Sequence, residues 1–363
     1  MGRIKNIEFL RIVGCIAIVM LHLFFTKIGH MHNVPFYHYW SMATKNGAKA
    51  VDLFFMLSGL FFAITYNPAL TTGKFLLKKI IRLYPVYLFG LIAFFIGTLI
   101  SSEYNFSIYN AIFSALGFNS TIFVKGSTGH VSAFWYVTTM LWTLLLLSGA
   151  LKNFDKNKIK YCMSIIVFFA YGFIISSGGG KIDNPYINFG GITTMGMLRG
   201  IAGISVGYLI GDWYKENIKK IKEWNVSIEG QILLTIIEAS CLYFIIKYMT
   251  YVKFTFKNDT LFLISFILII VLFLLKKGFI SRLLDTDIWN IFSKYTYSIY
   301  LSHQLVFMYL AALLWNNSMK FVVKHPIMNC SLTLSLVLIV GVMVYHLVEK
   351  PCAAYLKKRW LSE

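Results

Sequence analysis

The sequence predicts an all-α polytopic membrane protein, a bundle of about ten transmembrane helices with both termini in the cytoplasm. Hydrophobic residues make up 58% of the 363 residues and charged residues only 13%, whereas a soluble domain is about one quarter charged. The apolar residues also gather into stretches of about twenty, the length at which a helix crosses the hydrocarbon core of a bilayer. The distribution of Lys and Arg between the stretches then predicts the orientation.

The ten expected spans share a length near twenty residues and a low charge content. In chain order they are residues 8–28, 47–66, 83–101, 133–151, 161–177, 190–211, 228–247, 259–275, 291–314 and 327–348. All loops between them are short, so we expect one integral membrane domain over residues 1–363 with no appended soluble domain. Residues 108–124 are too polar for a span and suit a re-entrant or interfacial helix.

The formal net charge of +19 reflects topology, because the basic residues alternate from loop to loop. With the N-terminus in the cytoplasm, Lys and Arg are about twice as frequent on the inner side as on the outer side, as the positive-inside rule requires. This pattern predicts a multi-pass protein of the cell (plasma) membrane with cytoplasmic termini. It argues against a nucleic-acid partner.

The first span contains an arginine and a histidine in "RIVGCIAIVMLH", residues 11–22. Eleven residues turn an ideal helix through three turns plus about 20°, so Arg11 and His22 share one face, roughly 16 Å apart along the axis. Charged and polar groups within a bilayer are costly and usually face a cavity or a partner. The alternative is structural: Arg11 reaches cytoplasmic lipid phosphates, and His22 bonds a backbone carbonyl.

Asp52 lies near the outer end of the second span, in "AVDLFFMLSGLFF". Since the first two spans are antiparallel, we expect Asp52 and His22 at a similar depth. A carboxylate at that place would orient the imidazole and stabilise its protonated form, as in a general base with its orienting partner.

Four cations precede the third span in "KFLLKKIIRLYPVY", residues 74–87. Lys79 and Arg82 are three residues apart and share a helix face. Together they suit a phosphate seat, because arginine can bind phosphate through two hydrogen bonds. The alternative is that these residues only serve topology, as in any cytoplasmic loop.

Taken together, these stretches resemble the membrane acyltransferase family 3 in its membrane-only branch. The spacing of Arg11 and His22 matches the first-helix signature of that family, and "VDLFFMLSGLFF" with Asp52 resembles its second-helix pattern. Further resemblances, in order along nearly the whole chain, are "KIIRLYP" (79–85), "FWYV" (134–137), "YSIYLSHQLV" (297–306) and "VEKP" (348–351). Lys79 departs from the pattern, since the family has an arginine there.

The resemblance implies an enzyme, an acyltransferase that moves an acyl group, usually acetyl from acetyl-CoA, to a hydroxyl of a carbohydrate. The carbohydrate would be a glycan or a lipid-linked saccharide, and acyl-CoA would be a substrate, with no bound cofactor. The implied roles are catalysis for His22 and Asp52 and acyl-CoA binding for Arg11, Lys79 and Arg82. Three further residues are candidates to line the same cavity: Arg199, His303 and Trp135. The alternatives are that Arg199, inside a span, extends to the membrane surface and that His303 makes a structural hydrogen bond.

A transporter or flippase of a lipid-linked saccharide is the alternative function, with Arg11, His22 and Asp52 serving proton coupling or substrate passage. Transporters often contain two related halves, and no such repeat is visible in this sequence. No metal site is expected, because the five cysteines lack ligand spacing.

Overall fold

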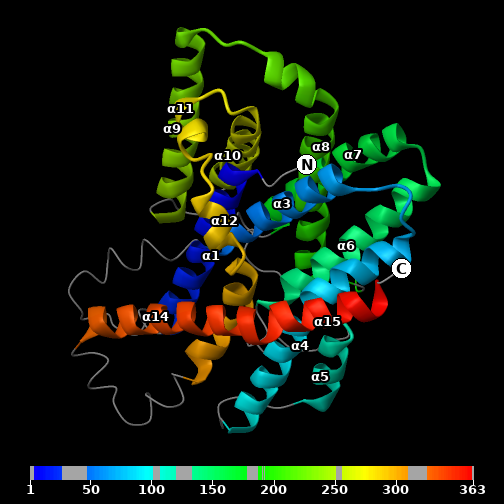
Figure 1. Cartoon of the computed structure of the whole chain (residues 1–363), viewed down its shortest axis with the longest axis vertical. Coiled ribbons are helices and arrows are strands. Elements are labelled where there is room, and N and C mark those ends of the chain that lie inside the picture. Colours follow the sequence, from blue (N-terminus) through cyan, green and yellow to red (C-terminus); the bar gives the residue numbers. More distant parts are fainter. Residues whose placement is uncertain are drawn as a thin grey trace.

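The computed structural model describes residues 4–26, 47–100, 107–119, 133–177, 187–189, 191, 193–250, 256–309 and 325–361, and these are almost entirely helical (Figure 1). The long helices are α1 (Lys5–Thr26), α3 (Ala50–Thr65), α4 (Thr72–Ile100), α6 (Phe134–Asn153), α7 (Lys156–Ser177), α8 (Met195–Glu223), α9 (Ile228–Thr250), α10 (Phe256–Leu275) and α14 (Pro326–Val344). The shorter elements are the 3₁₀ turn η2 (Gly47–Lys49), α5 (Ile108–Ala115), α11 (Phe279–Leu283), α12 (Ile288–Ser293), the π-helical turn η3 (Tyr345–Glu349), α15 (Lys350–Trp360) and the hairpin strands β1 (Asn188–Phe189) and β2 (Thr193–Thr194).

Eight helical stretches among the described residues are long and apolar enough to cross a membrane. Each of the ten expected spans overlaps a helix. Two of the ten expected spans, 190–211 and 291–314, fall on helices outside this set of eight, namely α8 and the helical segment 296–309. Hydropathy therefore identified the helices, and the all-α class of the expectation is confirmed for the described part of the chain.

The centre of the bundle is formed by α3 packed against α8 along a row of glycines. A Cβ atom at Gly59 would collide with the backbone carbonyl of Ile204, and one at Gly207 with that of Met56. Only glycine lets two helix backbones approach this closely, which is how helices without a hydrophobic driving force associate in lipid. These two helices therefore form the tightest contact in the molecule.

Large apolar side chains cover the outside of the peripheral helices. Phe168 and Phe169 of α7 are 75% and 68% exposed, and Leu233 of α9 and Leu338 of α14 are 58% and 54% exposed. A water-soluble surface does not carry so many large apolar side chains, whereas a lipid-facing surface does. The rim of the bundle is thus suited to a bilayer.

The C-terminal part of the chain forms one long rod, α14 followed by α15, that lies against α4 (Figure 1). Pro351 interrupts it, because proline lacks the N–H that an α-helix needs and its ring crowds the preceding turn. The chain responds with a π-helical turn over Tyr345–Glu349, in which the N–H of Lys350 bonds the carbonyl of Tyr345. Such turns frequently occur at functional sites.

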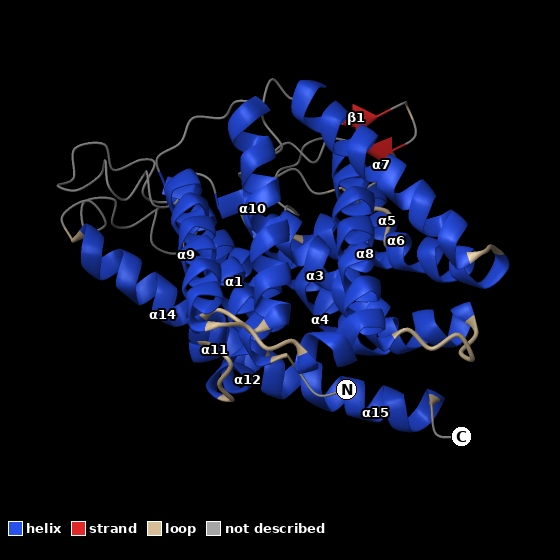
Figure 2. Ribbon diagram, turned by 90° about the horizontal axis from the view of Figure 1, so that it is seen from above, coloured by secondary structure: helices blue, strands red, loops and turns tan. Residues whose placement is uncertain are grey.

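Both termini lie at one end of the bundle, together with α11, α12 and α15, and the hairpin β1–β2 lies at the other (Figure 2). A common side for the two termini is what the sequence predicted. The cations before the third expected span are helical, because α4 begins at Thr72, and the shared helix face expected for Lys79 and Arg82 is therefore possible. Lysine and arginine are good helix formers, which allows α4 to continue beyond its apolar part.

Candidate active site

The four basic residues singled out in the first expected span and just before the third lie on two helices, as expected. Arg11 and His22 are both on α1, and Lys79 and Arg82 are both on α4. The guanidinium of Arg11 donates to the carboxylate of Glu8 over 2.9 Å, one turn earlier on α1. Arg11 is thereby oriented by its own helix.

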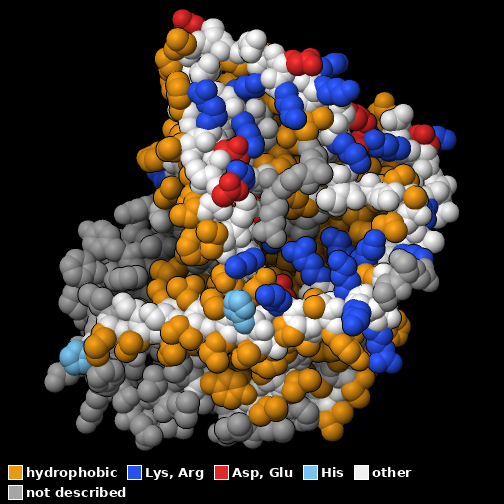
Figure 3. Space-filling view, in the orientation of Figure 1, with side chains coloured by type: hydrophobic (Ala, Val, Ile, Leu, Met, Phe, Trp, Pro, Cys, Tyr) orange, Lys and Arg blue, Asp and Glu red, His pale blue; other side chains and the backbone are white. Residues whose placement is uncertain are grey.

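A cavity of about 330 Å³ brings Arg11, Lys79 and Arg82 together, although α1 and α4 are far apart in the sequence. A fourth cation, Lys294, also lines it and was not singled out from the sequence. Glu8 is the one carboxylate in the lining. We call this space the cationic cavity; Figure 3 shows Lys and Arg side chains gathered around a hollow beside the α14–α15 rod. Its chemistry suits a ligand with several phosphates.

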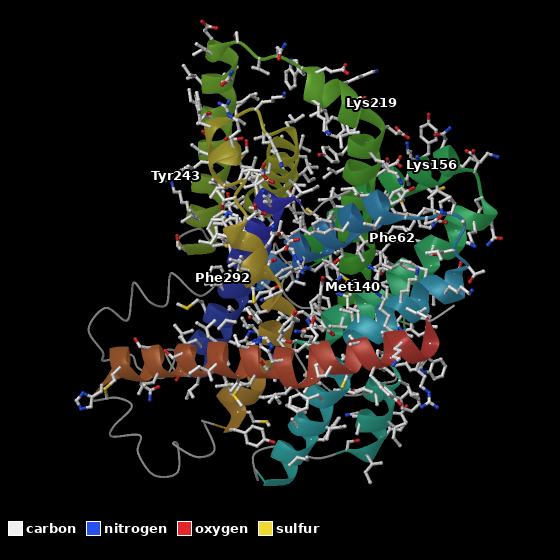
Figure 4. All side chains as sticks on the ribbon, in the orientation of Figure 1. Phe62, Met140, Lys156, Lys219, Tyr243 and Phe292 are labelled. Carbon is white, nitrogen blue, oxygen red and sulfur yellow. The ribbon has the colours of Figure 1, made fainter. Side chains whose placement is uncertain are left out.

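The inner wall of the cationic cavity is apolar and aromatic. Phe54, Leu57 and Ser58 of α3 line it together with Tyr136 and Met140 of α6, and Ser58 is in direct contact with both residues of α6. Figure 4 labels Met140 among these helices. The cavity thus has a charged mouth and an apolar interior, the arrangement needed for a ligand with a charged head and a less polar arm.

His22 lies against two residues of the helical segment 296–309. Its Nδ1 atom is 2.9 Å from the backbone oxygen of Ile18 and 3.2 Å from Nε2 of His303. Its Nε2 atom is 3.1 Å from Nε2 of Gln304. The two imidazole rings meet edge to face with centroids 4.8 Å apart. The backbone contact expected under the structural alternative is therefore present together with side-chain partners.

These contacts determine which ring nitrogen of neutral His22 holds the hydrogen. A carbonyl oxygen only accepts, so Nδ1 donates to Ile18 and Nε2 keeps its lone pair. The side-chain oxygen of Gln304 accepts from the backbone N–H of Ala133 over 3.3 Å, which directs its amide nitrogen to donate to Nε2 of His22. Nε2 is thus the basic atom of the site.

The expected contact between Asp52 and His22 is wrong. Nε and Nη2 of Arg199 on α8 donate to the two carboxylate oxygens of Asp52, over 2.9 and 2.5 Å, and Nη2 also donates to the backbone oxygen of Ala48 over 3.0 Å. Both Asp52 and Arg199 are fully buried. A bidentate pair with arginine satisfies a buried carboxylate better than a single bond to imidazole, so Asp52 takes part in packing α3 against α8.

The three residues expected to line the same cavity are not in the lining of the cationic cavity. Arg199 is paired with Asp52, and the ring of Trp135 lies 5.9 Å from the guanidinium carbon of Arg199. His303 is buried against His22. Removing one partner of a buried pair such as Arg199–Asp52 costs about 3–5 kcal/mol, because it leaves a charge uncompensated.

A second buried ion pair was missed from the sequence. Lys49 of η2 donates to Asp259 of α10 over 2.6 Å and to the hydroxyl of Tyr248 of α9, and all three residues are fully buried. From the sequence, Lys49 is one of the outer-side lysines in the charge pattern and carries no other role. Its position one residue before an apolar helix was the signal for a buried role, since a charge placed there needs a partner.

No group of three or more His, Cys, Asp or Glu residues that could hold a metal ion occurs in the part of the chain that the structure describes. The outer-loop histidines near residue 30 lie outside that part.

Comparison with known proteins gives one family. A family model described as an acyltransferase domain, Acyl_transf_3, matches residues 4–346, which is nearly the whole chain. Neither a curated protein nor a solved structure matches the chain.

Proposed function

Because this chain belongs to acyltransferase family 3, we propose that it is a membrane O-acyltransferase that takes its acyl group from cytoplasmic acyl-CoA. The acceptor is a hydroxyl of a cell-envelope or extracellular carbohydrate. One observation carries the proposal: a single helix, α1, contributes Arg11 to the cationic cavity and His22 to a contact with the buried His303. One residue would hold the head of the donor, and the other would act at its reactive end.

The charge of the cationic cavity supports CoA as the donor. Its lining combines two arginines and two lysines, Arg11, Arg82, Lys79 and Lys294, and the head of CoA carries a diphosphate and a further phosphate. Arginine binds phosphate through two parallel hydrogen bonds, whereas lysine acts as a point charge. Lys79, where the family has an arginine, keeps the positive charge but lacks the two parallel N–H donors of a guanidinium.

The length of the donor arm supports the same assignment. Arg11 and His22 are roughly 16 Å apart along α1. An extended chain gains about 3.6 Å for every three bonds. The roughly thirteen bonds between the inner phosphorus of CoA and its sulfur therefore also span about 16 Å. A phosphate at Arg11 would bring the thioester to the depth of His22.

In this proposal His22 is the general base. Its Nε2 lone pair would take the proton of the acceptor hydroxyl, the hydroxyl oxygen would attack the thioester carbon, and the carbon–sulfur bond would break. The proton on His22 would then pass to the departing thiolate to give CoA. The amide of Gln304, which donates to Nε2 in this structure, would have to yield this place to the hydroxyl. Such general-base help is typically worth about 10²–10⁴-fold in rate.

Acetyl is the proposed acyl group and the plasma membrane the proposed location, with both termini in the cytoplasm. The distribution of Lys and Arg supports this orientation, and the two termini lie at the same end of the bundle. The cationic cavity is lined by residues near the start of α1, the end of α3 and the start of α4. The donor would therefore enter from the side of the termini.

The decisive experiment is acceptor-dependent release of CoA from acetyl-CoA by membranes that contain the wild type, His22→Ala or His346→Ala. His346 is an exposed histidine on the C-terminal rod and serves as the matched control. We expect wild type and His346→Ala to release CoA and to acylate envelope polysaccharide, and His22→Ala to lose at least about 10²-fold of both. Equal activity of His22→Ala would remove the proposed base. Glycan export without any CoA release would instead favour a transporter.

A further inference from the structure

Three aromatic rings from three helices meet between the cationic cavity and the histidine pair. They are Phe54 of α3, Tyr136 of α6 and Tyr300 of the segment 296–309. The ring centroids of Phe54 and Tyr136 are 6.0 Å apart, those of Phe54 and Tyr300 are 6.1 Å apart, and those of Tyr136 and Tyr300 are 5.6 Å apart. Each ring therefore contacts the other two, in the range typical of paired aromatics.

The place of these rings follows from what lies on each side. Phe54 and Tyr136 form part of the wall of the cationic cavity. On the other side the ring of Tyr300 is 5.9 Å from that of His303, whose Nε2 atom is 3.2 Å from His22. The three rings thus form a continuous row of contacts from the wall of the cavity to the histidine pair. We call Phe54, Tyr136 and Tyr300 the aromatic barrier.

A short chain of hydrogen bonds holds the aromatic barrier in place. The hydroxyl of Ser58 donates to the backbone oxygen of Phe54 over 2.8 Å. The hydroxyl of Tyr136 lies 2.9 Å from that of Ser58 and 3.3 Å from the same backbone oxygen of Phe54. Tyr136 is thereby attached to α3 at the edge of the cavity, and its ring is kept in this row.

We infer that the aromatic barrier is the specificity-determining element of the site, which admits the acyl-pantetheine arm to His22 and keeps water from the cytoplasmic cavity away from it. This inference rests on the proposed function. A base that activates a sugar hydroxyl would equally activate water, whose oxygen would bond to the acyl carbon while the carbon–sulfur bond breaks, giving a carboxylate and CoA. Closely packed rings exclude water from that place, and a flexible arm can pass by displacing Tyr136.

The experiment compares Phe54→Ala and Tyr136→Phe with the wild type in detergent or liposomes. Tyr136→Phe keeps the ring and removes only the hydroxyl. Tyr87→Phe is the matched control, because Tyr87 is a buried tyrosine whose hydroxyl donates to the backbone oxygen of Ser114 at a different place. Three quantities are measured: CoA binding, acceptor-dependent transfer, and CoA release from acetyl-CoA without acceptor.

We expect the ratio of acceptor-free hydrolysis to transfer to rise about tenfold or more in Phe54→Ala, which opens the path. Loss of one hydrogen bond in Tyr136→Phe should raise it about fivefold, and Tyr87→Phe should leave it unchanged. CoA should still bind to all variants, since the four cations are untouched, and the ratio is therefore measured at saturating acetyl-CoA. Only Tyr87→Phe, away from the cavity, should leave the Kd for CoA unchanged.

The outcomes separate this inference from the proposed function. One outcome is that the wild type binds CoA and transfers acyl groups while neither variant changes the ratio of hydrolysis to transfer. In that case the role inferred for the aromatic barrier is wrong and the proposed function stands. If the wild type neither binds CoA nor releases it from acetyl-CoA, both are wrong. Should Phe54→Ala unfold, Tyr136→Phe alone decides, because it preserves the packing of the ring.

Discussion

The lining of the cationic cavity holds four cations and one carboxylate, whereas Arg199 and Lys49, at the other end of α3, each have a carboxylate of their own. The carboxylate of Asp52 accepts two hydrogen bonds from Arg199, and the carboxylate of Asp259 accepts one from Lys49. The first arrangement leaves an excess of positive charge for an anionic ligand. In the second arrangement each positive charge is compensated by a carboxylate of the protein itself. The same residue types thus stabilise the fold at one end of α3 and, in the proposed function, bind the donor at the other.

The largest expected effect is the loss of stability when the buried ion pair of Arg199 and Asp52 is broken. Arg199→Ala should destabilise the fold by about 3–5 kcal/mol, because it leaves the carboxylate of Asp52 buried without its partner. The measurement is the thermal or denaturant midpoint in detergent. The double variant Asp52→Asn/Arg199→Gln is the control, and it should recover part of the loss because both charges are removed. An unchanged midpoint for Arg199→Ala would contradict the structural role of the pair.

Arg11→Gln should weaken the binding of acyl-CoA. It should cost less stability than Arg199→Ala, because the glutamine amide can still donate to the buried carboxylate of Glu8. Loss of a charge-assisted hydrogen bond costs about 1.5–3 kcal/mol, which corresponds to a rise of the Kd for CoA by about 10–150-fold. Titration of the purified protein with CoA measures it directly. A fall in the midpoint of unfolding without any change in the Kd for CoA would show that Arg11 stabilises the fold and does not bind CoA.

Lys294→Gln should have a smaller effect of the same kind. Lysine lacks the fork of arginine and acts as a single charge, so we expect CoA to bind about three- to tenfold more weakly, a difference of up to about 1.4 kcal/mol. The loss should shrink as salt is raised, since salt screens charges near water. Equal affinity of wild type and variant at low salt would exclude Lys294 from the phosphate seat.

The smallest expected effect concerns the exposed carboxylate of Glu216, at the end of α8. Hydrogen bonds from Lys156 and Lys160, over 2.9 and 3.2 Å, lower the pKa of Glu216. Since its folded pKa is below its unfolded value, its contribution is present above the unfolded pKa and is lost as pH falls through the folded pKa. Half of the side chain is exposed, so Glu216→Gln should cost less than about 1 kcal/mol at pH 7.

A pH series of unfolding midpoints checks this prediction. The wild type and Glu216→Gln should converge in acid, where the glutamate is protonated. Divergence of the two in acid would contradict the assigned pairing.

Much of the fold was predictable, because hydropathy acts over single stretches of about twenty residues and needs no knowledge of neighbours. The shared face of Arg11 and His22 was also predictable, since it depends only on helix geometry within α1. The partner of Asp52 was not. Arg199 is 147 positions away on α8, and which helices are neighbours depends on packing that the sequence does not state locally.

A usable signal for that pair was nevertheless present. Arg199 and Asp52 are oppositely charged residues inside apolar spans, and buried charges in a membrane pair with one another. This rule pairs Arg199 with Asp52 and so predicts the observed ion pair in place of a contact between Asp52 and His22. The partners of His22 lacked even this signal, because His303 and Gln304 lie in a helix more than 280 positions away.

The glycine contacts between α3 and α8 limit which parts of the molecule can move during a reaction cycle. No side chain separates the two backbones at Gly59 and Gly207, so the helices cannot slide or roll against each other without steric collision. Phe54 and Ser58 are therefore carried on an immobile pair. Any opening of a passage toward His22 has to come from Tyr136 of α6 or Tyr300 of the segment 296–309. The stationary pair would serve as the fixed reference against which the site opens and closes again.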